Sequence, residues 1–414
     1  MEAEMWKWIG VLWCLAGPAI AADYYVNGTT GNDAQPGTQA QPWRSLSRVN
    51  AQTLEPGDRI LLARGTAFVG HLTIAQSGTE AKPIVVSAYG EGPAPKLMNP
   101  RFGLEFGRVV SVYGSYVTVE NLYLYDGATP PPDEPPLPWK ESHQHKLVTD
   151  MAGIYTDAAT HHVTLQNNEF NNMPVGVRVR GANSLVKSNY FHDASRITEY
   201  WGAMAIVIVG PHNEVAHNRI ENYGFYGGAY VNDGAAVELD GEDRFFDAHH
   251  TFVHHNLSRN TKGGFLEIAG NTHDVTIANN ISDDVDKFVG TNGIRNLKID
   301  GNIIIRTRIP DITDKDFWSL RAIFWSICWN GCAGDRDAGV SITNNIFYLT
   351  APHRIYLGPE NPHGFMSATH SANLYWSPDG DAAALLGQPL GAGEAIADPG
   401  FKDLLDGDYG RQTQ

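Results

Sequence analysis

Short segments in which apolar and polar residues alternate recur along this chain. Two of them, VELDG from residue 237 and LEIAG from residue 266, each end in a glycine. Successive side chains of a β-strand point to opposite faces, so the apolar residues of each segment can face a core. Glu238, Asp240 and Glu267 then face outward. The pattern predicts two short strands with carboxylates on one outer wall.

Two earlier segments have the same form, GVRVRG from residue 176 and AIVIVG from residue 205. If all four are successive strands of one parallel sheet, residues at matching positions lie about 4.8 Å apart. Glu238 is then expected directly beside Glu267. Arg178 and Arg180 are expected on the same wall.

A second repeat consists of short strands that end in asparagine. Its members are Asn168, Asn189, Asn218, Asn256, Asn280, Asn302 and Asn345, which follow one another at intervals of 21, 29, 38, 24, 22 and 43 residues. Such self-similarity is typical of a solenoid, whose units bury their apolar face only by stacking. Asparagine tolerates the left-handed conformation, and its amide can bond to identical neighbours. We expect these asparagines to form one column at a turn.

The repeats predict an all-β chain, a right-handed parallel β-helix of about ten coils with long loop insertions. Residues 1–21 contain Lys7, an apolar run and an Ala-Ile-Ala ending, which is typical of a secretory signal. We therefore expect a single β-helix domain over residues 22–414 and a secreted or periplasmic location. In an oxidising compartment Cys328 and Cys332 either pair or remain buried thiols.

Composition restricts the partners. The chain has 414 residues, of which 42% are hydrophobic and 18% charged, enough for a large core. Its formal net charge of −16 argues against nucleic acid or an anionic membrane as a partner. It also disfavours a highly anionic polymer, unless a bound cation or local arginines offset the field.

The opening DYYVNGTTGND, the segments QPWRSL and EPGDRILLARG, and the asparagine turns resemble the pectin-lyase-like superfamily of secreted carbohydrate-active enzymes. The resemblance covers nearly all of the chain after residue 21. It implies the right-handed parallel β-helix and a polysaccharide or oligosaccharide substrate.

The acidic wall suits glycoside hydrolysis. Two carboxyls one rung apart match the roughly 5 to 5.5 Å of a retaining glycosidase, whereas Asp240 offers a wider pair with room for an inverting water. Like charges this close should raise one pKa towards that of a general acid. We therefore predict a secreted glycoside hydrolase with Glu238, Asp240 and Glu267 as catalytic residues and no required cofactor. Because these acids repel, their amide variants are expected to fold.

A Ca²⁺-dependent polysaccharide lyase is the alternative, because Ca²⁺ takes several carboxylate oxygens. The segment EIAGN from residue 267 is similar to the metal-binding stretch of the chondroitinase B and alginate lyase family. The resemblance implies that a lysine shortly afterwards abstracts a proton α to a uronate carboxyl. This chain has Thr272 and His273 there instead. Arg178, Arg180, Lys262 or Lys287 could substitute, and no spacing selects among them. A non-catalytic glycan-binding solenoid is a third hypothesis.

Candidate substrate-binding residues are more scattered. Arg178 and Arg180 either bind a substrate carboxylate or neutralise the acidic wall. Trp201, Tyr226 and Tyr230 lie in inserted loops, where aromatic rings either stack on sugars or pack the loops onto the solenoid. His254 is expected to point outward and is a further candidate. The register places His217 and His255 beside the asparagine column, which favours hydrogen bonding over a metal site.

Overall fold

The computed structural model describes residues 21–99, 107–126, 150–194, 202–226, 232–240, 248–269, 272–308, 322–326, 338–350, 353–355, 365, 368–404 and 407–411. The predicted signal segment, up to residue 20, and both Cys328 and Cys332 lie outside these ranges. Among the described residues, no helix is long and apolar enough to cross a membrane.

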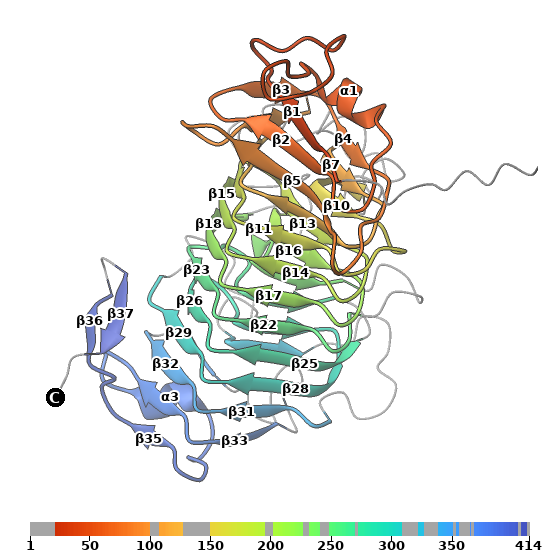
Figure 1. Ribbon diagram of the computed structural model, residues 1–414. Helices are drawn as coiled ribbons and strands as arrows, with labels where there is room; N and C mark the ends of the chain where they lie inside the picture. The colour runs from red at the N-terminus through yellow and green to blue at the C-terminus, as the bar shows by residue number, and fades with distance from the viewer. Residues whose placement is uncertain are drawn as a thin grey trace, which may run out of the picture.

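Three parallel sheets run along the molecule (Figure 1). Sheet 1 consists of β1 (Asp23–Val26), β2 (Arg59–Ala63), β5 (Ile84–Tyr89), β8 (Val117–Glu120), β11 (Thr164–Gln166), β14 (Leu185–Lys187), β17 (Glu214–Ala216), β22 (Phe252–His254), β25 (Thr272–Ala278), β28 (Ile294–Asp300), β31 (Ser341–Thr343) and β33 (Thr369–Ser371). Sheet 2 consists of β4 (Leu72–Ile74), β7 (Arg108–Val112), β10 (Ala152–Thr156), β13 (Val175–Val179), β16 (Met204–Ile208), β21 (Val237–Leu239), β24 (Leu266–Ile268), β27 (Val289–Thr291) and β30 (Phe324–Ser326).

Sheet 3 consists of β3 (Ala67–Val69), β6 (Lys96–Met98), β9 (Tyr123–Tyr125), β12 (Glu169–Asn171), β15 (Tyr190–Ala194), β18 (Arg219–Tyr223), β23 (Leu257–Arg259), β26 (Ile281–Asp283), β29 (Ile303–Arg306), β32 (Ile346–Leu349), β34 (Leu374–Trp376) and β35 (Ala395–Ile396). Outside these sheets lie the antiparallel pairs β19 (Phe225–Tyr226) with β20 (Asn232–Asp233) and β36 (Phe401–Asp403) with β37 (Asp408–Arg411). The described residues also form two short helices, α1 (Leu46–Asn50) and α3 (Ala382–Leu386).

The chain visits the sheets in rotation, as in β11, β12, β13 and then β14, and each strand pairs in parallel with its counterpart one coil later. The predicted right-handed parallel β-helix is therefore confirmed. Figure 1 shows the coils stacked from the N-terminal end, in red, to the C-terminal end, in blue.

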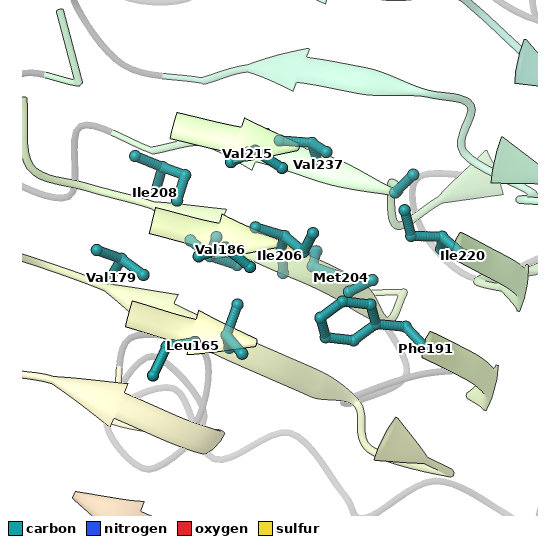
Figure 2. Close-up of a cluster of buried hydrophobic side chains, with 14 of the residues drawn as sticks. Leu165, Val179, Val186, Phe191, Met204, Ile206, Ile208, Val215, Ile220 and Val237 are labelled. Carbon is teal, nitrogen blue, oxygen red and sulfur yellow. The ribbon is translucent and has the colours of Figure 1, made fainter. Parts of the chain in front are cut away.

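The core consists of the inward residues of all three sheets. In Figure 2, Val186 and Val215 of sheet 1, Ile206 of sheet 2, and Phe191 and Ile220 of sheet 3 gather in one interior, and all five are fully buried. Each coil covers the apolar face of the next, as the alternation predicts.

The asparagine column is confirmed as a continuous hydrogen-bonded ladder. The Nδ2 of Asn189 donates to Oδ1 of Asn218 at 3.0 Å, and Asn218 donates to Asn256 at 2.9 Å. The pattern extends from Asn168 to Asn373. However, the left-handed residue is the one before each ladder asparagine, for example His217 with φ of 56°. The ladder asparagines are thus selected by their buried amides, not by their backbone conformation.

Asn218→Ala is expected to lower the apparent Tm by several degrees. The change leaves the Asn189 main-chain N–H without its acceptor and removes one of the two acceptors of the Asn189 Nδ2 group, at about 1–3 kcal/mol for each buried group that loses its partner. Thermal denaturation followed by circular dichroism measures the effect. Lys187→Ala, at a partly exposed position of the same sheet, is the control. Equal Tm values for the two variants would contradict a structural role of the ladder.

Candidate functional site

The outward positions of sheet 2 form one column across its nine strands. Its members, in order along the sheet, are Thr73, Ser111, Tyr155, Arg178, Val207, Glu238, Glu267, Gly290 and Trp325. Glu238 pairs in register with Glu267, which confirms that they are neighbours on adjacent rungs. The preceding rung carries Val207, which has no titratable group.

Asp240 lies just beyond the end of β21, two residues after Glu238. Its main chain continues the parallel pairing, because its N–H donates to the Ile208 carbonyl at 2.9 Å. One rung later the equivalent position is Ala269, and the rung after that has Asn292, whose Nδ2 donates to the Ala269 carbonyl at 3.2 Å. The three predicted acids therefore occupy two adjacent rungs of one face. We call Glu238, Asp240 and Glu267 the acidic wall.

Arg178 stands in the same outward column, but its side chain is buried beside the acidic wall. Its side chain is fully buried, and Nη1 lies 3.8 Å from Oδ2 of Asp240. Burial of this guanidinium favours the hypothesis that Arg178 balances the charge of the wall. Arg180 donates from Nη1 to the Tyr155 hydroxyl at 2.9 Å and is thereby tied to the earlier coils.

A lysine from the next coil completes the site. Lys287 precedes β27, and its Nζ lies 3.1 Å from Oε2 of Glu267 and donates to the Gly263 carbonyl at 2.7 Å. Its side chain is only 4% exposed, whereas that of Glu267 is 25% exposed. The ammonium also lies 5.4 Å from the centre of the Trp325 ring. Sequence reasoning had left four cationic residues open here, and the structure brings Lys287 to Glu267.

Gly290 makes room for this lysine. A Cβ at residue 290 would lie 2.7 Å from Cδ and 2.8 Å from Cε of Lys287, and 2.8 Å from the Trp325 ring. A side chain at residue 290 would therefore force Lys287 or Trp325 to move, and the Lys287 side chain occupies the space that it would fill. In the sequence, the signal of this arrangement is Gly290 itself, which stands at an outward position of the sheet three residues after Lys287.

Buried polar groups hold the segment that carries Lys287. The fully buried Arg306 guanidinium donates to the main-chain carbonyls of Ser282 at 2.8 Å, Lys287 at 3.0 Å, and Asp286. Burial raises the pKa of the adjacent Asp286 carboxyl to about 7, although the Lys287 ammonium opposes this rise. The backbone at Lys287 is therefore fixed from inside the solenoid.

Other predicted substrate-binding residues are not gathered here. His254 lies on β22 in sheet 1, largely buried, with Nε2 3.0 Å from Oε1 of Glu214. It therefore belongs to a different face from the acidic wall and does not point freely outward. Trp201 and Tyr230 lie outside the described residues, as does the side chain of Tyr226.

The acidic wall has the donor chemistry of a calcium site. Ca²⁺ binds six to eight oxygen atoms, often carboxylates from several residues. Glu238 and Glu267 are in register, and Asp240 is on the same strand segment as Glu238. Stacked like charges are destabilising unless something offsets them. Arg178 and Lys287 offset part of this charge, and the residues fit a hard divalent cation.

A protein-family model matches more than half of the chain. The Chondroitinase B family model matches residues 45–307, a range that includes the acidic wall and Lys287. No curated protein sequence matches the chain.

Solved structures resemble the chain in architecture. They include a GH136 lacto-N-biosidase from Eubacterium ramulus, at 18% identity and a TM-score of 0.54, covering 86% of this chain and 64% of that one. XylC in complex with xylose has 11% identity and a TM-score of 0.56, covering 86% and 76%. A tailspike protein of E. coli bacteriophage HK620, in complex with a pentasaccharide, has 12% identity and a TM-score of 0.51, covering 83% and 60%. At these identities the likeness shows the fold alone, and this chain spans about two thirds of the lacto-N-biosidase.

Proposed function

Because the chain belongs to the chondroitinase B family, we propose that it is a polysaccharide lyase that cleaves a uronic-acid polymer by β-elimination. The observation that carries the proposal is the position of Lys287, whose Nζ lies 3.1 Å from Glu267 on the acidic wall. The family resemblance implies a proton-abstracting lysine, which the segment after Glu267 lacks. Lys287 supplies it from the following coil.

In the proposed reaction Lys287 acts as the general base. In the resting ion pair Lys287 is an ammonium beside Glu267, so it first releases a proton to water. The neutral amine then donates N–H groups to the Gly263 carbonyl and to Glu267, and its lone pair takes the C5 proton of the uronate. The electron pair of the C5–H bond forms a C4=C5 double bond as the C4–O bond breaks. Water protonates the departing oxygen. In the Lys287–Glu267 pair, Glu267 is the more exposed side chain, so the sugar approaches the Lys287 amine from the side of Glu267.

Charge compensation is the second requirement. Removal of the C5 proton places negative charge next to a carboxylate, so the substrate's own charge must be offset. Glu238, Asp240 and Glu267 would hold a Ca²⁺ ion, which, when bound, neutralises the uronate carboxylate and so stabilises that developing charge. Such a cation also explains how a chain with a net charge of −16 accepts an anionic polymer.

Glycoside hydrolysis is the second candidate function. It is favoured by the register of Glu238 and Glu267, which places two carboxyls one rung apart, as a retaining mechanism requires. The position of Lys287 weighs against it, because a retaining mechanism needs two carboxyls and has no role for a nearly buried lysine 3.1 Å from one of them.

Product analysis on a panel of uronic-acid polymers separates the two reactions. We expect new absorbance in the near ultraviolet from the unsaturated uronate, together with new reducing ends. Chelator should abolish the activity, and added Ca²⁺ should restore it. Reducing ends without absorbance, insensitive to chelator, would instead support the hydrolase.

The export predicted from residues 1–21 is part of the same proposal and is tested by sequencing the N-terminus of the protein from the culture medium.

A further inference from the structure

A group of histidines lies at the corner where the chain enters three successive strands of sheet 1. His212 precedes β17, His249 and His250 precede β22, and His273 and Asp274 lie at the start of β25. These three strands are stacked in Figure 1. The main chains are in register, because the His212 N–H donates to the His249 carbonyl at 2.9 Å and the His250 N–H to the His273 carbonyl at 3.2 Å.

The side chains of these five residues converge. His250 is the shared member, since its ring centre lies 4.8 Å from that of His212 and its Nε2 lies 3.9 Å from Oδ2 of Asp274. His249 stacks on His273 at 5.0 Å, and His273 Nδ1 lies 2.6 Å from Asp274 Oδ2. Within each of two trios, His212 with His249 and His250, and His250 with His273 and Asp274, one potential ligand atom per residue lies within 4.8 Å of the others. We call these five residues the histidine cluster.

We propose that the histidine cluster binds a divalent transition-metal ion of the Zn²⁺, Cu²⁺ or Ni²⁺ class. Imidazole nitrogen is the ligand these ions share, and the two trios offer three nitrogens, or two nitrogens and one carboxylate, which are donor sets that Zn²⁺ accepts with water in the remaining position. Ligands at 2.0–2.1 Å around a tetrahedral ion are roughly 3.4 Å apart. The observed spread of up to 4.8 Å closes with small rotations, which the exposed His212 and His250 side chains allow.

The backbone of the turn does not account for these histidines. His212, His250 and Asp274 have φ of 58°, 53° and 56°, in the left-handed region. The same turn uses Asn183 one coil earlier and Asn296 one coil later, with φ of 53° and 55°. Asparagine therefore satisfies the conformation, so the backbone does not require imidazole, and imidazole at this turn adds ring contacts and a nitrogen that can bind a metal.

A neighbouring trio of His217, His254 and His255 is a weaker candidate. Its contacts are of the same kind as those of the cluster, since His254 Nδ1 lies 2.8 Å from His255 and Nε2 3.0 Å from Glu214, while His249 Nδ1 lies 2.6 Å from His250 Nδ1. The trio is a single group of potential ligands, however, whereas His250 joins two such groups in the histidine cluster. The five-residue cluster has Asp274 as a carboxylate ligand as well, and it lies on sheet 1, so this proposal does not depend on the proposed lyase site of sheet 2.

Zn²⁺ titration of the protein without a purification tag, followed by calorimetry, tests the inference. Excess Ca²⁺ in the buffer occupies the acidic wall with a hard cation, so that oxygen sites do not contribute. We expect saturable Zn²⁺ binding, and a rise in Tm with Zn²⁺ concentration, because a ligand bound to the native state stabilises it. His250→Asn removes the shared ligand and keeps a residue suited to the turn.

The variant should weaken Zn²⁺ binding at least ~10-fold. His162→Asn is the matched control, since His162 occupies the same turn with φ of 55° but, among the described residues, belongs to no group of three potential metal ligands. It should bind Zn²⁺ like the wild type. His273→Gln, which removes a different ligand, provides the second test if His250→Asn does not fold. Absence of saturable binding, or equal affinity in the wild type and the ligand variants, would overturn the proposal.

Discussion

Replacement of Lys287 by methionine is expected to lower kcat/KM for elimination by about 10²–10⁴-fold, the usual effect of losing a general base. Methionine keeps the length of the buried stem but cannot accept a proton. The Glu267 carboxylate loses the cation 3.1 Å away, yet its own side chain is one-quarter exposed and can be solvated. Initial rates of absorbance increase on the best polymer of the panel measure the effect.

Lys262→Met is the matched control for this experiment. Lys262 lies in the same coil as Glu267, and its Nζ is 2.6 Å from Oδ1 of Asn260, which follows β23 of sheet 3. Its replacement should change kcat/KM little. If Lys287→Met retained near-wild-type activity with unchanged circular dichroism, Lys287 would have only a structural role and the proposed base would be wrong.

Glu267→Gln is expected to reduce turnover by at least ~10²-fold and also to lower the Tm. From the sequence, this variant was expected to fold without loss, because like charges would be relieved. The structure changes that expectation. Lys287 is nearly buried, and the variant leaves its ammonium with Asp286, 3.9 Å away, in place of Glu267 at 3.1 Å. Breaking a fully buried pair costs about 3–5 kcal/mol, and the loss is smaller here because Glu267 is partly exposed and Asp286 remains.

The double variant Glu267→Gln with Lys287→Met separates the two effects. It removes both charges, so we expect the Tm to recover towards that of the wild type while activity stays lost. Glu214→Gln, at an exposed acid of sheet 1, is the control and should leave activity unchanged. Recovery of activity in the double variant, or an unaffected Glu267→Gln enzyme, would show that the acidic wall is not the catalytic centre.

The assignment of substrate-binding residues shows where sequence patterns were insufficient. An outward position in a strand does not specify which sheet faces the substrate. His254 alternates outward as the pattern predicts, yet it lies in sheet 1 and bonds to Glu214. Arg178 also occupies an outward position, but it is completely buried, with Nη1 3.8 Å from Asp240.

The sequence by itself determined the fold and the register of its repeats. Alternation has a period of two and the asparagine turns recur once per coil, so the neighbours on adjacent rungs, Glu238 with Glu267, follow from spacing alone. Only the tertiary structure decided which lysine joins them. Both Lys262 and Lys287 are candidates by their position in the sequence. Lys287 is the one that reaches Glu267, because its side chain extends over Gly290, which has no side chain of its own. The histidine cluster depends in the same way on stacking, because His212 and His273 lie 61 residues apart in the sequence and two rungs apart in space.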